Sequence, residues 1–525
     1  MENNSLSSSN GSSSLTIKIT AGKVLKSSLY SFLSVLISRI GGLIFTIIIA
    51  RSLFPELFGI YSLALTIILT LATFTDLGLN ATLIRYLAES LKIKTKKAES
   101  KAKAKARSRL CFLFGFKILL TACFSLVLFF AAKPIALYIF KKPLLISPIQ
   151  LGALYLFTIS LQGFFSSIFY SLQKVSYIAI GETIFQVLRI ALVALLFSFY
   201  KSVSTAFIAL IIASFAAFVF FYSILAKRYS FLLKGKKQRL EKEEKRKLLG
   251  FFGWLTISSI SLIFFAHVDI FMLGIFLPAQ FAGFYNAIFT IVGAIASFVA
   301  FGSVLLPVFT QLEENRIERG FRKVFRYLTM LAIPAAIGLA FVIVPAIQLI
   351  YGQAYLPLSY KLAITITSVL LSLLVVEAAL TAAYSSLFQA KELPKIPSLL
   401  IVIVSIANII LNYAFIKAGL SIAEQYGLVG VALATLLVRY GNMAGLAVLA
   451  RKKLKIKIRP ALVIKPLIAS FVMLVFLFAF DWLVPLNILN GILMIIAAIF
   501  VYFIVLWITK GLEKKDFSLI KEIRI

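Results

Sequence analysis

The chain contains very little of what most enzyme active sites need. Its 525 residues include one histidine and two cysteines, and no Gly-rich phosphate loop followed by Lys and Ser or Thr occurs. A zinc site of clustered Cys and His and a built-in nucleotide-hydrolysing domain are therefore excluded. The two cysteines, Cys111 and Cys123, lie 12 residues apart in one apolar run. On a helix they would be about 18 Å apart, too far for a disulfide.

Charge is also scarce, and acidic charge is the scarcer sign. Charged residues make up 14% of the chain and hydrophobic residues 61%, whereas a soluble domain is roughly 45–50% apolar. With a mean hydropathy of +1.00, a water-soluble domain is excluded. The net charge is +34, which in a soluble protein would suggest a nucleic-acid partner. Here the basic residues lie between apolar runs, so no nucleic-acid partner is expected.

Runs of about 20 mostly apolar residues recur from Leu25 to Lys510, the length that spans a bilayer. Lipid offers no hydrogen bonds to the backbone, so these runs must be helices. The sequence predicts an all-α integral membrane protein with 14 transmembrane helices. Their expected limits are Leu25–Ala50, Phe58–Tyr86, Arg109–Phe130, Leu144–Ser171, Val175–Phe199, Val203–Ala226, Phe251–Leu277, Gln280–Thr310, Phe325–Ile350, Leu358–Phe388, Ser398–Lys417, Gly427–Ala450, Ala461–Val484 and Leu486–Thr509.

Lys and Arg concentrate in every second connecting segment, the pattern of cytoplasmic loops. The richest are KIKTKKAESKAKAKARSR, the segment 227–250, and RKKLKIKIR. The expected outer segments hold only Arg51, Lys133, Lys141, Lys142, Lys201, Lys361 and Lys417. We therefore expect a multi-pass protein of the cell (plasma) membrane with both termini cytoplasmic and its basic segments beside anionic lipid headgroups.

The chain is expected to contain a parallel internal repeat. LFPELFGIYSLA and FLPAQFAGFYNA share Pro, Gly and Tyr in order, with Gly59 and Tyr61 each 224 residues before Gly283 and Tyr285. The expected domains are a disordered Ser- and Asn-rich tail (1–23), a six-helix bundle (24–226), a basic linker (227–250), a second six-helix bundle (251–450), helices 13 and 14 (451–510), and a cytoplasmic tail (511–525).

The segment GLIFTIIIARSLFPELFGIYSLALTIILTLATFTDLGLNATLIRYLAE resembles the polysaccharide-export branch of the MOP superfamily, which includes Wzx-type oligosaccharide flippases. The resemblance rests on its ARSL, FG-Y and DLGL elements. VDIFMLGIFLPAQFAGFYNA, IYGQAYLPLSYKLAI, NIILNYAFI and YGLVGVALATLL are similar to further stretches of that family. The resemblance implies two six-helix bundles around a central cavity, with a final helix pair, that move lipid-diphosphate-linked oligosaccharide by alternating access.

Ionisable residues in mid-helix are costly, about 2.5–3.5 kcal/mol each, so they must face protein or a wet cavity. They are Arg39, Asp76, Lys117, Glu182, Arg189, His267, Asp269, Glu377 and Arg439. Spacings of i, i+4 and i+7 place Glu182, Gln186 and Arg189 on one helix face, and Thr435, Arg439 and Asn442 on another. We expect Arg39, Arg189 and Arg439, with Gln186, Thr435 and Asn442, to line the substrate cavity, where Arg can replace the water around a diphosphate. The alternative is that these charges pair across helices.

The carboxylates of Glu182, Glu377 and Asp269 are candidates for coupling to H⁺ or Na⁺, and no cofactor is expected. For Asp269, a structural contact with the opposite bundle is the alternative, and its helix position points it about 200° away from His267. Asp76 is expected to cap a helix that restarts at Leu77. Lys117 is expected to extend toward the inner interface.

These features predict a flippase, not an enzyme, that takes an oligosaccharide on a polyprenyl diphosphate from the inner to the outer leaflet for surface polysaccharide or glycoprotein synthesis. The expected partners are lipid-linked oligosaccharide, membrane lipids, and a glycan polymerase or glycosyltransferases of the same pathway. One alternative is a MATE-like drug/cation antiporter. Another is a membrane-embedded glycosyltransferase or polymerase, which would usually carry a large outer loop with acidic residues. Every expected outer loop here is short.

Overall fold

The computed structural model describes residues 9–91, 96–235, 238, 240–299, 317–484 and 488–512. In these ranges the regular structure is helical and no strand is present, as the composition predicts. The chain divides into two compact units. The first is Met1–Leu53 with Leu63–Ile260, and the second is Phe54–Ser62 with Ser261–Ile525.

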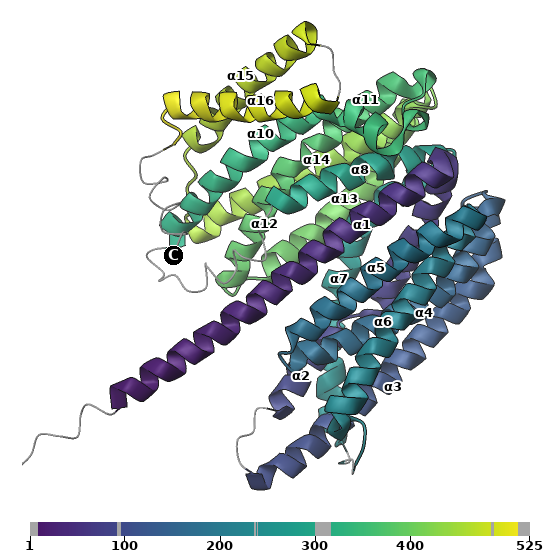
Figure 1. Cartoon of the computed structure of the whole chain (residues 1–525), viewed down its shortest axis with the longest axis vertical. Helices are drawn as coiled ribbons and strands as arrows, with labels where there is room; N and C mark the ends of the chain where they lie inside the picture. Colours follow the sequence, from purple (N-terminus) through teal and green to yellow (C-terminus); the bar gives the residue numbers. More distant parts are fainter. Residues whose placement is uncertain are drawn as a thin grey trace, which may run out of the picture. The chain divides into compact units, whose positions relative to one another are not determined.

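Among the described residues, the first unit contains five whole α-helices, the start of another, and a long first helix without its segment Phe54–Ser62, and Figure 1 labels each of them. They are α1 (Ser9–Asp76), α2 (Leu79–Leu91), α3 (Lys96–Pro134), α4 (Ile146–Ser171), α5 (Val175–Phe199), α6 (Val203–Arg228) and α7 (Lys242–Phe276). Helix α7 extends beyond Ile260, the last residue of the first unit, so its later part belongs to the second unit.

Helix α1 is kinked at Phe54, which has φ 57° and ψ 172° and precedes Pro55. Proline lacks an N–H and disfavours helical geometry in the residue before it, so the helix changes direction here. The kink lies in the expected connection between the first two membrane helices. The structure differs from the expected disordered tail, because α1 begins at Ser9 and residues 9–23 are helical. Extending an existing helix costs much less than starting one.

The second expected membrane helix, Phe58–Tyr86, is broken between α1 and α2. Leu77 and Gly78 adopt positive φ angles of 40° and 86°, a conformation that ends a helix. The Asp76 carboxylate accepts a hydrogen bond from the backbone N–H of Asn80 at 3.0 Å. The expected cap is therefore present, although the helix restarts two residues later than expected.

The second unit contains the remaining helices that the structure describes (Figure 1). They are α8 (Ala279–Val299), α10 (Ile317–Tyr351), α11 (Lys361–Ser372), α12 (Leu374–Ala390), α13 (Lys395–Leu420), α14 (Tyr426–Leu454), α15 (Ala461–Leu483) and α16 (Ile488–Ile508). The expected eighth helix extends to Thr310, and its residues after Val299 lie outside the described ranges. The expected tenth helix is interrupted at Leu373, which separates α11 from α12.

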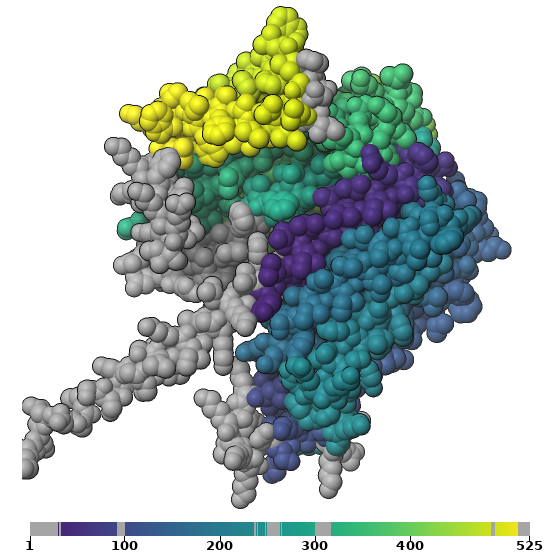
Figure 2. Space-filling view, viewed as in Figure 1, coloured from purple at the N-terminus to yellow at the C-terminus, as the bar shows by residue number. Residues whose placement is uncertain are grey.

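Among the described residues, twelve helical stretches are long and apolar enough to cross a membrane. One of them, Leu33–Leu91, has 59 residues and contains the kink at Phe54, so it provides two crossings of about 20 residues each. Helix α7, which has 35 residues, provides another crossing, and its part Phe265–Phe276 is apolar. The structure thus accommodates the 14 predicted membrane helices. Exposed apolar side chains of α16, such as Phe500 and Trp507, both 65% exposed, suit contact with lipid. Figure 2 shows α16 in yellow at the surface of the molecule.

The final helix pair packs on α10 within the second unit. Met330 of α10 joins Met473 of α15 and Met494 of α16 in one buried apolar cluster. The Tyr502 hydroxyl of α16 donates a 2.7 Å hydrogen bond to the backbone oxygen of Met330. Helices 13 and 14 of the prediction are therefore attached to the second unit by a core of their own.

The basic segment after α6 packs against the start of α3. Arg107 donates from Nε to the backbone oxygen of Phe231 at 3.0 Å. Arg109 pairs with Glu244 at 2.6 Å and donates to the backbone oxygen of Tyr86 at 2.9 Å. Burial opposes ionisation of Glu244, but the hydrogen bond and charge of Arg109 outweigh it, so the pKa of Glu244 lies below its ordinary value. The predicted linker is therefore fixed to the first unit.

The two repeated motifs meet at a close helix crossing inside the second unit. A Cβ atom on Gly59 would lie 2.6 Å from the carbonyl carbon of Ala279 and 3.1 Å from the backbone nitrogen of Gly283. One turn along, Asn286 donates a 2.7 Å hydrogen bond to the Ser62 hydroxyl. Both the glycine pair and this polar pair are separated by 224 residues, the spacing of the predicted repeat. The crossing therefore joins equivalent positions of the two motifs.

Candidate functional site

A buried carboxylate on α7 forms the centre of a polar cluster in the second unit. Asp269 is 2% exposed. Its Oδ2 accepts a 2.8 Å hydrogen bond from the Tyr285 hydroxyl. Its Oδ1 accepts from Asn412 at 3.2 Å and from Asn408 at 3.4 Å. In the part of the chain that the structure describes, no Lys, Arg or His forms an ion pair with Asp269. Among the described residues, all its hydrogen-bond partners are uncharged and lie in its own unit.

Further oxygen atoms surround this carboxylate. The Thr435 hydroxyl on α14 lies 3.4 Å from the Tyr285 hydroxyl and donates to the backbone oxygen of Val431 at 2.9 Å. Asn412 Oδ1 is buried, and no hydrogen-bond partner for it occurs among the described residues. Carboxylate, amide, hydroxyl and backbone oxygens are the ligands of hard cations. With only one carboxylate, the cluster matches a small monovalent cation better than a multivalent metal, and no group of three His, Cys, Asp or Glu suited to a metal occurs in the residues described.

Arg439 of α14 forms an ion pair with Glu377 of α12. The Nη1 to Oε2 distance is 3.9 Å, and the Thr381 hydroxyl donates to Glu377 Oε1 at 2.7 Å. The guanidinium also lies over two aromatic rings, 5.0 Å from the centre of Phe265 and 5.7 Å from that of Phe289. For Arg439, the structure therefore favours the alternative in which charges pair across helices.

In the second unit, the Asp269 cluster and the ion pair of Arg439 with Glu377 are connected through two aromatic rings. Tyr285, which hydrogen-bonds Asp269, stacks on Phe289 with ring centres 5.9 Å apart, and Phe289 contacts Arg439. The predicted residues Asp269, Thr435, Arg439 and Glu377 thus belong to one buried polar core. Asn442, on the same face of α14, is 2% exposed, and its Oδ1 has no hydrogen-bond partner within the described ranges.

In the first unit, the predicted polar face of α5 packs against α1. Gln186 is 4% exposed and donates to Glu182 Oε1 at 2.6 Å. A Cβ atom on Gly41 would lie 2.6 Å from Gln186 Oε1, so glycine allows α1 to pass closely. The Arg189 guanidinium lies 4.6 Å from the centre of the Phe45 ring. Cation–π contact stabilises such a charge away from bulk water. The structure thus brings Glu182 and Gln186 into contact, whereas Arg189 lies over the rings of Phe45 and Phe185.

Two other predicted residues behave differently from this group. Arg39 is exposed and makes no hydrogen bond or ion pair with any residue that the structure describes. Lys117 is 1% exposed and donates from Nζ to the backbone oxygen of Thr75 at 3.0 Å. The expectation that Lys117 extends to the interface is therefore wrong. The break after Asp76 leaves the last carbonyls of α1 without helical partners, and one of them accepts this ammonium.

Three members of the Asp269 cluster were not predicted as site residues because they carry no charge. Tyr285 stood out only as part of the repeated motif. Asn408 and Asn412 sit four residues apart in the apolar stretch NIILN, and Asn412 donates to the backbone oxygen of Asn408 at 2.9 Å. Amides on one face of a membrane helix are themselves costly, so this spacing was the signal that could have identified them.

Residues 24–313 match the family described as "Polysaccharide biosynthesis protein". The match covers more than half of the chain. The chain belongs to this family. No curated protein sequence matches the chain. The family assignment confirms the resemblance drawn from the sequence motifs.

Solved structures show the same fold. A structure titled "Lipid II flippase MurJ, inward closed conformation" is 20% identical, covers 91% of this chain and 97% of its own, and has a TM-score of 0.71. Two MATE family transporters of the MOP superfamily, inward-facing and outward-facing, are 15% and 14% identical with TM-scores of 0.51 and 0.52. They cover 81% and 82% of this chain, and 96% and 95% of their own. This family member therefore has the fold of a MOP superfamily membrane transporter.

Proposed function

We propose that this family member is a flippase that moves an oligosaccharide on a polyprenyl diphosphate from the inner to the outer leaflet, for surface polysaccharide or glycoprotein synthesis. The family match over residues 24–313 carries the proposal. The similarity in fold is greater to a lipid II flippase, with a TM-score of 0.71, than to the MATE transporters at 0.51 and 0.52. A glycan polymerase or glycosyltransferases would act with it in the same pathway.

The deciding experiment measures lipid-linked glycan in each leaflet. In a strain lacking this protein, lipid-linked oligosaccharide should accumulate on the inner leaflet and surface glycan should fall. Sensitivity to cationic dyes and drugs should stay unchanged, and the gene supplied in trans should restore the glycan. Normal transbilayer distribution in the deletion strain would reject the flippase function.

We further propose that Asp269 is where transport couples to a monovalent cation, Na⁺ or H⁺. Of the three candidate carboxylates, Glu377 has a basic partner in Arg439 and Glu182 accepts from Gln186. Asp269 is held by neutral donors alone among the described residues. The amides of Asn408 and Asn412 present nitrogen to it. Rotating each amide exchanges nitrogen for oxygen and would turn the cluster into a cation cage without moving the backbone.

Cation dependence of stability tests this assignment in the purified protein. Thermal unfolding should be compared in NaCl, KCl and choline chloride at equal ionic strength, over a range of pH. A ligand at 100 times its dissociation constant adds about 2.7 kcal/mol of stability. We expect Na⁺ or acid to stabilise the wild type and Glu377→Gln, but not Asp269→Asn. The same ion response in Asp269→Asn would contradict the assignment.

Arg39 and Arg189 are the arginines that we propose to contact the diphosphate, with Gln186 of α5 in the same unit. Thr435 and Asn442 of α14 stay candidates for lining the substrate cavity in the second unit. Arg39 is exposed, so its neutral variant strands no buried carboxylate. Arg39→Gln should therefore abolish glycan export while the protein remains abundant and stable in membranes. Arg39→Lys keeps the charge without the planar fork and should restore export only in part. Normal export by Arg39→Gln would remove this residue from the mechanism.

A MATE-like drug/cation antiporter is the second candidate. It is favoured by the two buried carboxylates of the second unit, Asp269 and Glu377, each 2% exposed. Loss of drug resistance with normal surface glycan in the deletion strain would establish this function in place of the flippase.

A further inference from the structure

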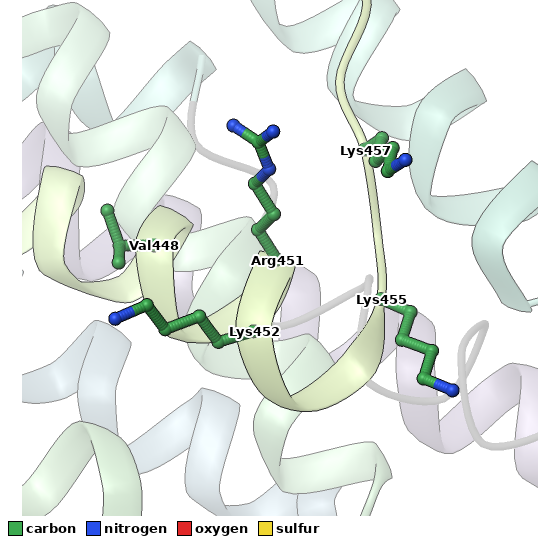
Figure 3. Close-up of a pocket in the computed structure, with 5 residues that line it drawn as sticks. All are labelled: Val448, Arg451, Lys452, Lys455 and Lys457. Atoms are coloured by element: carbon green, nitrogen blue, oxygen red, sulfur yellow. The ribbon is translucent and has the colours of Figure 1, made fainter.

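A basic pocket lies in the second unit at the end of α14, where the chain turns toward α15. Its cavity volume is about 720 Å³, and it is lined by Val448, Arg451, Lys452, Lys455 and Lys457. Figure 3 shows Arg451 rising from the last turn of α14 and Lys457 on the extended segment across from it. Four of the five lining residues are therefore cationic, and none is acidic.

These four charges have no carboxylate partner among the described residues. All four side chains are exposed, and none of them forms an ion pair with a carboxylate in the described part of the chain. Basic residues in the last helical turn complement the helix dipole, which accounts for Arg451 and Lys452. It does not account for Lys455 and Lys457, because both follow the end of α14 at Leu454.

The wall of the pocket formed by the segment after α14 is fixed in place. Lys455 adopts a left-handed conformation with φ 55° that terminates the helix, and its N–H donates to the backbone oxygen of Ala450. Ile456 is 5% exposed and anchors the next residue. Arg322 of α10 donates from Nε to the backbone oxygen of Lys457 at 3.0 Å. This fixed segment therefore forms one wall of a positively charged pocket.

The position of the pocket indicates the kind of anion. Helices α14 and α15 are both long and apolar enough to span a membrane, and only residues 455–460 connect them. The pocket therefore lies at a membrane boundary, where lipid phosphates are the most concentrated anions. Val448, one of its lining residues, is 52% exposed and offers an apolar surface on the membrane side. A cationic rim beside an apolar wall matches an amphiphile better than a soluble anion.

We propose that this pocket binds the phosphate headgroup of a membrane lipid. The phosphate would be held by Arg451 and Lys457 across the cavity, with Lys452 and Lys455 adding positive potential at its edge. Arginine supplies paired donors to phosphate oxygens, and lysine supplies a point charge. This site is separate from the Asp269 cluster and does not depend on the proposed transport function.

The test is a lipid titration of the purified full-length protein followed by native mass spectrometry. The probes are dioleoylphosphatidylglycerol and, with identical chains but no net charge, dioleoylphosphatidylcholine. Each basic residue near anionic lipid contributes roughly fivefold in affinity. We expect R451Q/K452Q/K455Q/K457Q to weaken phosphatidylglycerol binding at least tenfold, and the milder R451Q/K457Q at least fivefold. Phosphatidylcholine should bind weakly to every variant.

The matched control, K101Q/K234Q/K242Q/R246Q, removes the same charge from exposed positions in the first unit. Because these residues also lie in segments expected beside lipid headgroups, the control should weaken phosphatidylglycerol binding, but less than the four-residue pocket variant does. An equal loss in the control, or no loss in R451Q/K457Q provided its thermal unfolding is unchanged, would overturn the site.

Competition identifies the source of the phosphate. Displacement of phosphatidylglycerol by a polyprenyl diphosphate at lower concentration would assign the pocket to a lipid diphosphate, and failure to displace it would assign the pocket to leaflet phospholipid. Inorganic diphosphate that competes as well as either lipid would overturn the assignment to a lipid.

Discussion

The contact between the two repeated motifs is most directly tested by adding one methyl group. In Gly59→Ala the new Cβ atom would lie 2.6 Å from the carbonyl carbon of Ala279, while ordinary van der Waals contact begins at 3.4 Å. The obstructing atoms belong to backbone, so no side chain can rotate away. The Ala279 oxygen would lie nearer still, so the segment Phe54–Ser62 and α8 would have to separate by more than 0.8 Å at this point, and the hydrogen bond from Asn286 to Ser62 would lengthen.

The expected cost follows from two opposing effects. Overpacking a tight contact costs about 1–3 kcal/mol, and a backbone obstruction places Gly59→Ala at the upper end. Replacing glycine with alanine inside a helix stabilises that helix by about 1 kcal/mol. We therefore expect a net loss of about 2 kcal/mol, a factor of roughly 30 in the folding equilibrium. Thermal unfolding of the detergent-purified protein, with the monodisperse fraction remaining after a heat step, measures this loss.

Gly293→Ala, in the helix α8 that Gly59 approaches, is the matched control, because a Cβ atom there has no neighbour within 4 Å among the described residues. It should leave stability unchanged or raise it by up to about 1 kcal/mol. Equal stability of Gly59→Ala and Gly293→Ala would refute the close crossing.

Three further predictions follow from pairs of charges and from topology. Arg439→Gln strands the buried Glu377 carboxylate and should lower protein abundance, at a cost of about 3–5 kcal/mol; adding Glu377→Gln should restore abundance, and failure to do so would show that the pair is not structural. Because Arg109 lowers the pKa of Glu244 in the folded state, its stabilisation should be complete above about pH 4.5 and decline as the pH falls further. Thermal unfolding of Glu244→Gln should lack this decline, and an unchanged pH profile would contradict the pairing. A cysteine at Lys234, in a chain without its native cysteines, should resist an impermeant thiol reagent in intact cells, and labelling from outside would reverse the proposed orientation.

Helix content and approximate limits were predictable because lipid forces the backbone to satisfy its own hydrogen bonds. α5 spans Val175–Phe199, the predicted limits. The interruptions were less predictable. Pro55 marked the kink in α1, but Leu77 and Leu373 are of a residue type that does not mark a helix end. The start of α1 at Ser9 was missed because a Ser-rich composition describes a free chain and not one that continues an apolar helix.

The candidate site could be predicted where charge and helical spacing coincide. Glu377 and Thr381, or Glu182 and Gln186, lie four residues apart on their own helices and form the expected contacts. Contacts between helices depend on rotation and register that one sequence does not contain. Neither the pairing of Arg439 with Glu377 nor the approach of Asn412 to Asp269 was visible from spacing, and Lys117 was misplaced for the same reason.

The environments of the buried carboxylates decide which of them is suited to bind and release a cation. Glu377 has a permanent counter-charge in Arg439, so a bound cation would have to displace or be repelled by the guanidinium. Asp269 is surrounded by hydroxyl and amide groups, each of which can present either a hydrogen or an oxygen. Such neutral groups stabilise the carboxylate without a cation and can coordinate one when it arrives. Tyr285 hydrogen-bonds Asp269 and stacks on Phe289, and Phe289 in turn contacts Arg439. A rearrangement at Asp269 would therefore change contacts on the polar face of α14.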